Sequence, residues 1–370
     1  MRFEHLYVHV PFCARRCVYC DFSIAVRSSV PVDAFVTAIA RELATRHRDS
    51  SLELETLYFG GGTPSKLGPA GVDRLLGAIR ERATLRPGAE VTLEVNPEDV
   101  TTGAVTAWLR AGITRLSIGV QSFDDTVLAW MHRTHDAAGA RRAVEQARSA
   151  GATNVSIDLI FAVPSHLGRR WQRDLDVAVS LDLPHLSVYG LTVEERTPLG
   201  KWVARQAVTE APEDSFAAEF HEAHRALTGA GLEHYEVSNY GRAGQHSRHN
   251  RAYWRRAPYV GVGPSAHEFD GHSRRWNADA YAKWHSTVSS GGDPVEGSER
   301  LDEDQVAAEA VYLALRTTKG LDFMRESDEV AAWARAGWVI LENGTLKLTA
   351  DGWLRLDSIA AGLTHVRSRY

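Results

Sequence analysis

Six short runs rich in β-branched and apolar residues alternate with amphipathic stretches over the first 230 residues of this chain. The expected strands are residues 6–10, 56–60, 91–95, 115–120, 155–161 and 185–191. Helical periodicity is clearest at residues 33–47, 70–83 and 137–151. Strands that alternate with helices form a parallel sheet with helices outside it, so we predict an α/β fold, either doubly wound or barrel-like.

With 370 residues the chain is longer than a domain with a single hydrophobic core usually is, and its residue pattern changes near positions 231 and 296. We assign residues 1–230 to the α/β domain and residues 231–295 to strands and loops that extend it. Residues 289–298, "SSGGDPVEGS", have the composition of a linker. Residues 296–370 follow the order helix, helix, hairpin, helix, with "ENGT" as the hairpin turn, which predicts a small winged-helix-like α+β domain.

Charge and hydropathy exclude several classes of protein. The net charge is −5, Lys and Arg are spread throughout, and the last domain is not notably basic, so we expect no nucleic-acid partner. No apolar run approaches the roughly 20 residues that a membrane-spanning helix needs. The first strand carries Glu4 and His5, which do not suit a signal peptide. We therefore expect a soluble cytoplasmic protein.

All three cysteines of the chain, Cys13, Cys17 and Cys20, directly follow the first expected strand. An odd number argues against a disulfide framework, and close spacing in a reducing compartment favours metal or redox chemistry. A structural zinc site usually needs four ligands, and no second cysteine pair is present. Three thiolates on a [4Fe–4S] cluster would leave one iron without a protein ligand, free to bind an exchangeable group.

Polar residues and glycines recur where the next four expected strands end. They are Gly60, Gly61, Gly62, Thr63, Glu94, Asn96, Gln121 and Asp158. Each one alone is equally compatible with a solvated or structurally satisfied side chain, although a carboxylate inside an apolar strand is costly unless it is paired. Because ligands of (β/α) barrels bind at the carboxyl ends of the strands, the group together predicts a site beside the cysteines.

The spacing C-x3-C-x2-C, with Tyr19 just before the last Cys, resembles the signature of the radical S-adenosylmethionine (SAM) superfamily. The segments "YVHVPFC", "GGGTPS", "LEVNPE", "RLSIGVQSF", "HRTHD", "YEVSNY", "HNRAYW" and "GVGPSAH" resemble its oxygen-independent coproporphyrinogen III oxidase-like group over nearly the whole chain. The resemblance implies a partial, six-stranded, TIM-like (β/α) barrel with a smaller C-terminal domain. It also implies a [4Fe–4S] cluster ligated by SAM, a cofactor that supplies the difficult chemistry.

The resemblance assigns roles to individual positions. Those that match the cluster ligands are Cys13, Cys17 and Cys20. Those that match the lining of the cluster-bound SAM are Tyr7, Gly61, Gly62, Thr63 and Glu94. Those that match the rest of the adenosyl pocket, including a second SAM site in the true oxidases, are Tyr19, Gln121, Arg133 and Asp158.

Arg133 suits a carboxylate through paired hydrogen bonds, although a surface arginine on a helix is the alternative. Two positions depart from the family pattern. Ala162 stands where the family more often has Gly, and Met131 and His132 precede Arg133 where Leu-Gly is common.

Two functions compete within this group. The first is a coproporphyrinogen III dehydrogenase, which forms vinyl groups from propionates, and the second is a HemW-type haem chaperone. The oxidases resemble one another in a fourth cysteine, where this chain has Phe22, and in an N-terminal extension for which we expect no room here. "HNRAYW" resembles a motif associated with haem binding in the chaperones: His249 would offer an iron ligand, and Tyr253 and Trp254 a flat apolar surface.

We therefore predict a haem chaperone that carries a SAM-ligated [4Fe–4S] cluster and delivers haem to acceptor proteins. A radical SAM methyltransferase or cyclopropanase on the same scaffold is a third alternative. The sequence leaves open whether the protein is an enzyme, whether the acceptor is membrane-associated, and whether the protein is a homodimer.

Overall fold

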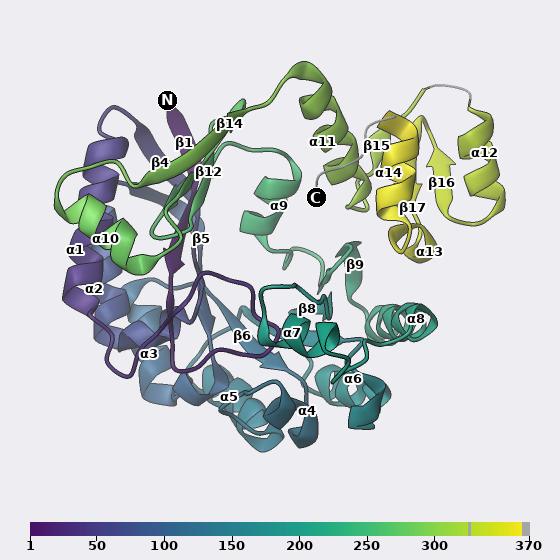
Figure 1. Cartoon of the computed structure of the whole chain (residues 1–370), viewed down its shortest axis with the longest axis horizontal. Coiled ribbons are helices and arrows are strands. Elements are labelled where there is room, and N and C mark those ends of the chain that lie inside the picture. Colours follow the sequence, from purple (N-terminus) through teal and green to yellow (C-terminus); the bar gives the residue numbers. More distant parts are fainter. Residues whose placement is uncertain (325–326, 365–370) are drawn as a thin grey trace.

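The computed structural model describes residues 1–324 and 327–364, and its largest element is a nine-stranded sheet (Figure 1). The strand order is β11-β1-β4-β5-β6-β7-β8-β10-β9. The six central strands are β1 (Arg2–Val10), β4 (Ser51–Gly61), β5 (Thr84–Val95), β6 (Arg115–Gln121), β7 (Val155–Phe161) and β8 (His185–Gly190). Each is parallel to its central neighbours. All six expected strands are present, and only the last residue of the sixth, Leu191, lies outside its strand. The predicted α/β fold is confirmed.

Alternation along the strands gives the sheet one apolar and one polar face. In β1, Leu6, Val8 and Val10 are fully buried in the hydrophobic core, whereas His5 and Tyr7 hydrogen-bond to other polar side chains. Because successive side chains point to opposite faces, the apolar set packs on the helices and the polar set faces the other way. A doubly wound sheet is apolar on both faces, so this alternation favours the curved, barrel-like arrangement.

Helices cover the apolar face of the sheet, as Figure 1 shows for the first half of the chain. They are α1 (Val32–Arg46), α2 (Gly68–Arg80), α3 (Thr102–Ala111), α4 (Asp125–Trp130), α5 (Ala137–Ser149), α6 (Trp171–Ser180), α7 (Pro198–Ala204) and α8 (Glu213–Gly229). Short 3-10 turns at Pro64–Leu67, Pro97–Asp99 and Ser165–Leu167 follow β4, β5 and β7. Helix α5 illustrates the packing, because its small residues Ala140, Ala143 and Ala147 are buried at helical spacing.

The middle segment adds strands at both edges of this sheet. Its elements are β9 (Glu233–Glu236), β10 (Asn239–Gly241), α9 (Arg248–Trp254), β11 (Val260–Val262), β12 (His267–Phe269), β13 (Ser273–Asn277), α10 (Tyr281–Ser289) and β14 (Val295–Arg300). The β9–β10 hairpin pairs antiparallel with β8, and β11 pairs parallel with β1. Strands β12, β13 and β14 form a separate three-stranded sheet.

The linker predicted at residues 289–298 is wrong in part. Residues 295–298 belong to β14, which pairs antiparallel with β13, so the domain boundary set at 296 falls inside a strand. Local composition suggested a linker because β14 is polar. Its pairing depends on distant partners, among them the ion pair between Arg274 and Glu299 (3.1 Å).

The C-terminal elements contain the expected sequence of helix, helix, hairpin and helix, with one additional short strand, β15, and one additional short helix, α13. They are α11 (Glu303–Leu315), β15 (Leu321–Asp322), α12 (Asp328–Arg335), β16 (Val339–Glu342), β17 (Thr345–Leu348), α13 (Ala350–Trp353) and α14 (Leu356–Thr364). Asn343 and Gly344 join β16 to β17 with φ angles of 50° and 76°, as the predicted hairpin turn requires. The indole of Trp353 donates to the carbonyl of Leu315 (3.1 Å), which holds α13 against α11.

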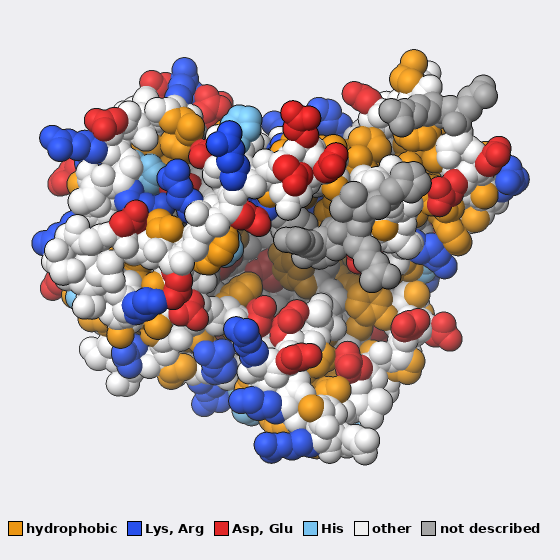
Figure 2. All heavy atoms as spheres, turned by 45° about the horizontal axis from the view of Figure 1, so that its top comes forward, with side chains coloured by type: hydrophobic (Ala, Val, Ile, Leu, Met, Phe, Trp, Pro, Cys, Tyr) orange, Lys and Arg blue, Asp and Glu red, His pale blue; other side chains and the backbone are white. Residues whose placement is uncertain are grey.

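The surface carries both signs of charge close together. Figure 2 shows acidic and basic side chains interspersed over one face, with apolar side chains gathered in a hollow near its centre. Over residues 1–324 and 327–364, no helix is long and apolar enough to cross a membrane.

The two departures from the family pattern fall at positions with left-handed backbone. Ala162 has a φ of 58° and His132 a φ of 60°. Glycine adopts this region without the steric cost that a Cβ atom brings, so a family preference for Gly at both positions has a simple physical origin. The backbone N–H of Ala162 donates to Glu219 (2.6 Å), which fixes the turn despite that cost.

A buried carboxylate fastens the middle segment to the barrel. Glu42 of α1 is fully buried and accepts hydrogen bonds from the N–H of Gly263 (2.9 Å), the amide of Asn277 (2.6 Å) and the indole of Trp284 (2.8 Å). Arg46 completes the group at 2.9 Å. These partners belong to three separate parts of the middle segment, so one side chain anchors β11, β13 and α10 together.

We expect Glu42→Ala to lower the free energy of unfolding by about 3–5 kcal/mol, because it removes the acceptor of the Gly263 N–H and of the Trp284 indole and one of the acceptors of Asn277 and Arg46. Glu55→Ala is the matched control, since Glu55 pairs with Arg86 at 2.7 Å but is 39% exposed. Its loss should cost less than about 1 kcal/mol. Urea denaturation followed by circular dichroism measures both, and equal small losses would contradict the anchoring role.

Candidate functional site at the barrel mouth

The three cysteines lie on one loop that begins where β1 ends. Cys13 belongs to β2 (Phe12–Cys13), which pairs with β3 (Ala25–Val26), and the backbone N–H of Cys20 donates to the carbonyl of Cys17 (3.3 Å). All three thiols are free and partly buried. They line one cavity of about 370 Å³ at the carboxyl ends of the strands.

The glycine run at the end of β4 holds this loop in place. The N–H of Gly62 donates to the carbonyl of Val10 (2.8 Å), and that of Thr63 to the carbonyl of Phe12 (2.9 Å), which continues the pairing of β1 and β4 past the sheet. The Thr63 hydroxyl lies 3.4 Å from the Cys13 sulfur. A Cβ atom on Gly62 would lie 2.7 Å from the Pro11 backbone, so only glycine permits this contact.

The structure brings nearly all the sequence-predicted residues to this cavity. Its wall includes Cys13, Cys17, Tyr19, Cys20, Gly61, Gly62, Thr63, Glu94, Asn96, Gln121, Arg133 and Asp158. Tyr7 does not line it; Tyr7 faces a neighbouring cavity, and its hydroxyl lies 3.1 Å from Nδ1 of His9. Gln121 has a φ of 69°, an uncommon backbone for a non-glycine residue that turns the chain at the mouth.

Glu94 presents a carboxylate to the cavity. The Tyr58 hydroxyl donates to Oε1 (2.7 Å), and the Gly61 N–H donates to Oε2 (3.2 Å). Burial raises the pKa of Glu94 to about 7, which these two hydrogen bonds oppose. Asp158 lies farther into the barrel, where Ser117 donates to it (3.3 Å) and burial raises its pKa.

Arg133 is part of the site and not the surface arginine of the alternative interpretation. It donates to the side chain of Asn96 (2.8 Å) and to the carbonyl of Gly119 (2.7 Å), and one of its terminal nitrogens lies 3.5 Å from the sulfur of Cys17. Its buried Nε atom has no hydrogen-bond partner among the described residues. A guanidinium held in this way can stabilise thiolate charge and still donate to a ligand.

The donor set fits an iron–sulfur cluster better than a single metal ion. Within the described residues, no three His, Cys, Asp or Glu side chains are close enough to share one ion. In a [4Fe–4S] cluster each thiolate binds a different iron, so thiols spread around one cavity suit it. Burial raises the pKa of Cys13, and that of Cys20 to about 11, so cluster assembly must release protons from these thiols.

His249 is not available as an iron ligand in this structure. Its side chain is only 1% exposed, its Nδ1 lies 2.6 Å from the Thr56 hydroxyl, and its Nε2 lies 2.9 Å from the Tyr253 hydroxyl. Burial lowers its pKa to about 3. Both ring nitrogens of His249 are thus already hydrogen-bonded, because α9 turns this face into the barrel, and a contact of His249 with haem stays a prediction.

Sequence reasoning missed three residues that shape the interior. Tyr58 and Ser117 hold the two carboxylates, and Gly119 supplies the carbonyl that fixes Arg133. Strand periodicity could have found Tyr58 and Ser117, since each lies an even number of positions from a predicted mouth residue on its own strand.

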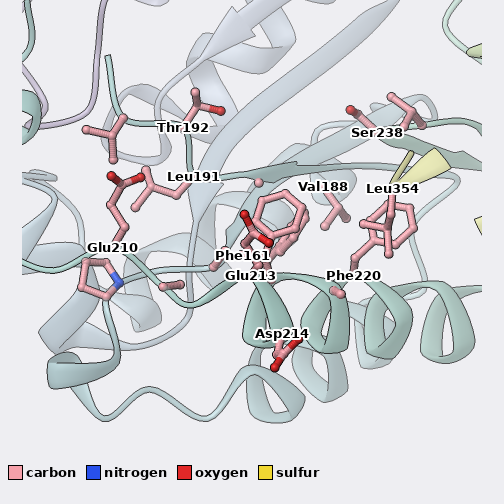
Figure 3. A pocket seen from close by; sticks show the side chains of 18 of the residues that line it. Phe161, Val188, Leu191, Thr192, Glu210, Glu213, Asp214, Phe220, Ser238 and Leu354 are labelled. Atoms are coloured by element: carbon pink, nitrogen blue, oxygen red, sulfur yellow. The ribbon is translucent and has the colours of Figure 1, made fainter. Parts of the chain in front are cut away.

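Another cavity, of about 850 Å³, adjoins the cysteine cavity, and none of the site residues predicted from the sequence lies in its wall (Figure 3). The two share Gly190, Leu191 and Thr192. Figure 3 shows an apolar wall that includes Phe161, Val188 and Phe220, with Glu210, Glu213 and Asp214 nearby. Its chemistry is that of a mainly apolar groove, without cysteine or histidine in its lining.

Comparison with known proteins gives consistent results. Residues 7–176 match the family model of the radical SAM superfamily. The heme chaperone HemW of Mycobacterium tuberculosis is 35% identical over 97% of this chain and 94% of its own length, and that of Bacillus subtilis is 30% identical over the same shares. Among solved structures, the coproporphyrinogen III oxidase HemN of Escherichia coli is similar in fold, with a TM-score of 0.82 at 22% identity over 97% of this chain and 89% of its own.

We expect Gly62→Ala to abolish most iron incorporation, because the new Cβ would lie 2.7 Å from Pro11 and 3.0 Å from the Cys13 sulfur and would displace the loop. Gly77→Ala is the control, since nothing lies within 4 Å of a Cβ at that position in α2. Iron and sulfide content after anaerobic reconstitution measures the effect. Full iron loading of the Gly62 variant would contradict the proposed constraint.

Proposed function

This chain belongs to the radical SAM superfamily, in the family of the heme chaperone HemW proteins, and we propose that it binds haem and transfers it to acceptor proteins. The similarity to the M. tuberculosis chaperone, 35% identity over 94% of that protein, is the observation that carries the proposal. It spans the barrel, the middle segment and the C-terminal domain, and not the cluster motif alone.

Phe22 favours the chaperone over the oxidase. It occupies the position where the oxidases have a fourth cysteine, is 57% exposed, and lines both the cysteine cavity and the smaller cavity beside it. An apolar ring there supplies no thiol. The similarity to the oxidase structure, at 22% identity, supports the shared fold and no shared activity.

Membership of the superfamily implies a [4Fe–4S] cluster and SAM, and we assign both to the cysteine cavity. Cys13, Cys17 and Cys20 would hold the cluster, and the iron without a protein ligand would bind the amino and carboxylate groups of SAM. When bound and reduced, such a pair can generate a 5′-deoxyadenosyl radical.

The chain's own residues suit the two ends of a SAM molecule. Glu94 offers a carboxylate that can accept N–H donors from the methionine amino group, and Gly61 and Gly62 line the same cavity. Arg133, whose Nε has no hydrogen-bond partner in the described part of the chain, can donate to a carboxylate or a ribose. Tyr19, Gln121 and Asp158 complete the wall where the adenosyl group would lie.

We expect the haem acceptor to be a protein. The interspersed charges of Figure 2 suit a protein partner better than the basic surface typical of nucleic-acid binding. We expect the transfer to start in the cytoplasm, with a membrane-associated acceptor and a homodimeric chaperone as the two arrangements to test.

We expect the purified protein to bind haem stoichiometrically and to leave coproporphyrinogen III unchanged under reducing conditions with SAM. Anaerobic reconstitution should give about four irons per chain, the number in a [4Fe–4S] cluster, and loss of this iron when any of the three cysteines becomes Ala. Difference spectroscopy measures haem binding, and chromatography of the porphyrins measures oxidation. Formation of protoporphyrinogen IX would overturn the chaperone assignment in favour of the oxidase.

We expect SAM affinity to rise by up to about tenfold between pH 6 and pH 8, because the pKa of Glu94 is about 7 and only its ionised form is a strong acceptor. Below pH 7 the carboxyl group is protonated and this contact weakens. Glu94→Gln should bind SAM weakly at both pH values. Equilibrium dialysis of the reconstituted protein measures the affinities.

Glu98→Gln is the matched control for this titration. Burial raises the pKa of Glu98, but hydrogen bonds from His135 and Thr134 outweigh it and lower the pKa to about 2, so this group does not titrate in that range. Its variant should keep the pH dependence of the native protein. A pH dependence that survives in Glu94→Gln would rule out Glu94 as its source.

A further inference from the structure

A separate cavity of about 460 Å³, which we call the aromatic cavity, lies between α9, the β12–β13 sheet and α11. Its wall includes Tyr253, Trp254, Tyr259, Phe269 and Trp276. This volume falls in the range of small-molecule sites, and the lining is of the apolar, aromatic kind that binds flat ligands. It shares no residue with the cysteine cavity.

A smaller cavity connects the aromatic cavity to the cysteine site. It shares Tyr253, Tyr259 and His267 with the aromatic cavity. It shares Phe22 and Gly61, among others, with the cysteine cavity. The three cavities therefore lie in series, with His267 at one junction and Phe22 at the other.

His267 is the histidine at this junction whose ring nitrogen can donate its lone pair to a metal ion. It is exposed on β12, and no described residue hydrogen-bonds to its ring nitrogens. His9, which lines the same small cavity, differs: its Nδ1 lies 3.1 Å from the Tyr7 hydroxyl, and its Nε2 donates to the carbonyl of Ser23 (2.9 Å). His249 is likewise bonded through both nitrogens.

The imidazole of His267 is oriented and neutral. It stacks on the ring of Trp276 across the β12–β13 pair, with ring centroids 5.9 Å apart and an interplanar angle of 24°. The cavity walls desolvate the ring in part although its outer edge is exposed, which lowers its pKa, and the nearby cation Arg274 adds to this effect while Glu299 opposes it. A neutral imidazole is the form that binds iron.

The charges around the cavity suit a flat apolar ligand that carries carboxylates. Three guanidinium groups lie over aromatic rings of the wall: Arg316 is 4.4 Å from the ring centre of Trp254, and Arg256 and Arg274 are 5.2 Å and 5.7 Å from that of Phe269. Glu309 pairs with both Arg256 and Arg274, so a ligand carboxylate would enter an existing ion-pair network. An aromatic floor edged by arginines is complementary to a porphyrin with propionates.

We propose that haem binds in the aromatic cavity with His267 as an axial ligand of the iron. This inference rests on the proposed haem-binding function and assigns it a place. His249 is then a positioning residue: its hydrogen bond orients Tyr253, whose ring forms the wall between the aromatic and connecting cavities.

Titration of the purified, full-length protein with ferric haem tests the proposal. We expect His267→Ala to weaken haem binding at least tenfold and to change the Soret maximum and the electron paramagnetic resonance signature of the iron. Added imidazole should restore the native spectrum by occupying the vacated position. His272→Ala is the matched control, because His272 is exposed between β12 and β13 and lines none of these cavities, and it should change neither affinity nor spectrum.

His249→Ala separates positioning from ligation. We expect it to lower thermal stability and haem affinity together, while the haem that still binds keeps the native spectrum. A native spectrum and affinity in His267→Ala, with an altered spectrum in His249→Ala, would overturn the site. Failure of the native protein to bind haem at all would instead overturn the proposed function, and the site with it.

Discussion

The close approach of the end of β4 to the end of β1 is the constraint on which the cysteine site depends. Gly62 and Thr63 extend the strand pairing onto Val10 and Phe12, where an ordinary parallel pair would diverge into loops. Two backbone hydrogen bonds and the absence of a Cβ atom at Gly62 thus set where Cys13 lies. Because the other two cysteines follow on the same short loop, their position relative to the strand ends is set by this contact as well.

The polar inner face of the barrel lowers the stability of the fold, because it buries carboxylates that a ligand can use. Glu94 and Asp158 both have raised pKa values because burial disfavours their charged forms. Their hydrogen bonds with Tyr58 and Ser117 return only part of that cost. A ligand that donates hydrogen bonds would stabilise the ionised form of these carboxylates. The interior therefore suits the binding of a polar ligand better than it suits maximal stability.

Periodicity predicted the parallel strands. The polar residues at the strand ends could also be predicted to share one site, because the carboxyl ends of parallel strands meet at one end of the barrel. The orientation of side chains could not be predicted from the sequence. The motif "HNRAYW" names residues that can bind haem, but α9 places His249 and Tyr253, four positions apart, on one inward face. His267 closes the motif "GVGPSAH", but no role could be assigned to it from the sequence, since its strand β12 has only three residues and no period to read. Ala162 and His132 were noticed as departures, and only their φ angles of 58° and 60° explain why glycine is the family's usual residue there.

The two roles open to His249 exclude each other on energetic grounds. Ligation of iron would require it to give up the contacts with Thr56 and Tyr253, and each buried polar group left unpaired costs roughly 1–3 kcal/mol. Moving it outward would also take the start of α9 away from Glu90, whose carboxylate accepts from the N–H of His249 at 3.0 Å. His267 requires no such rearrangement, since it is exposed at the cavity and no described residue hydrogen-bonds to its ring nitrogens. The motif is then best understood as the support of an aromatic wall, with the ligand to iron supplied from the strand opposite.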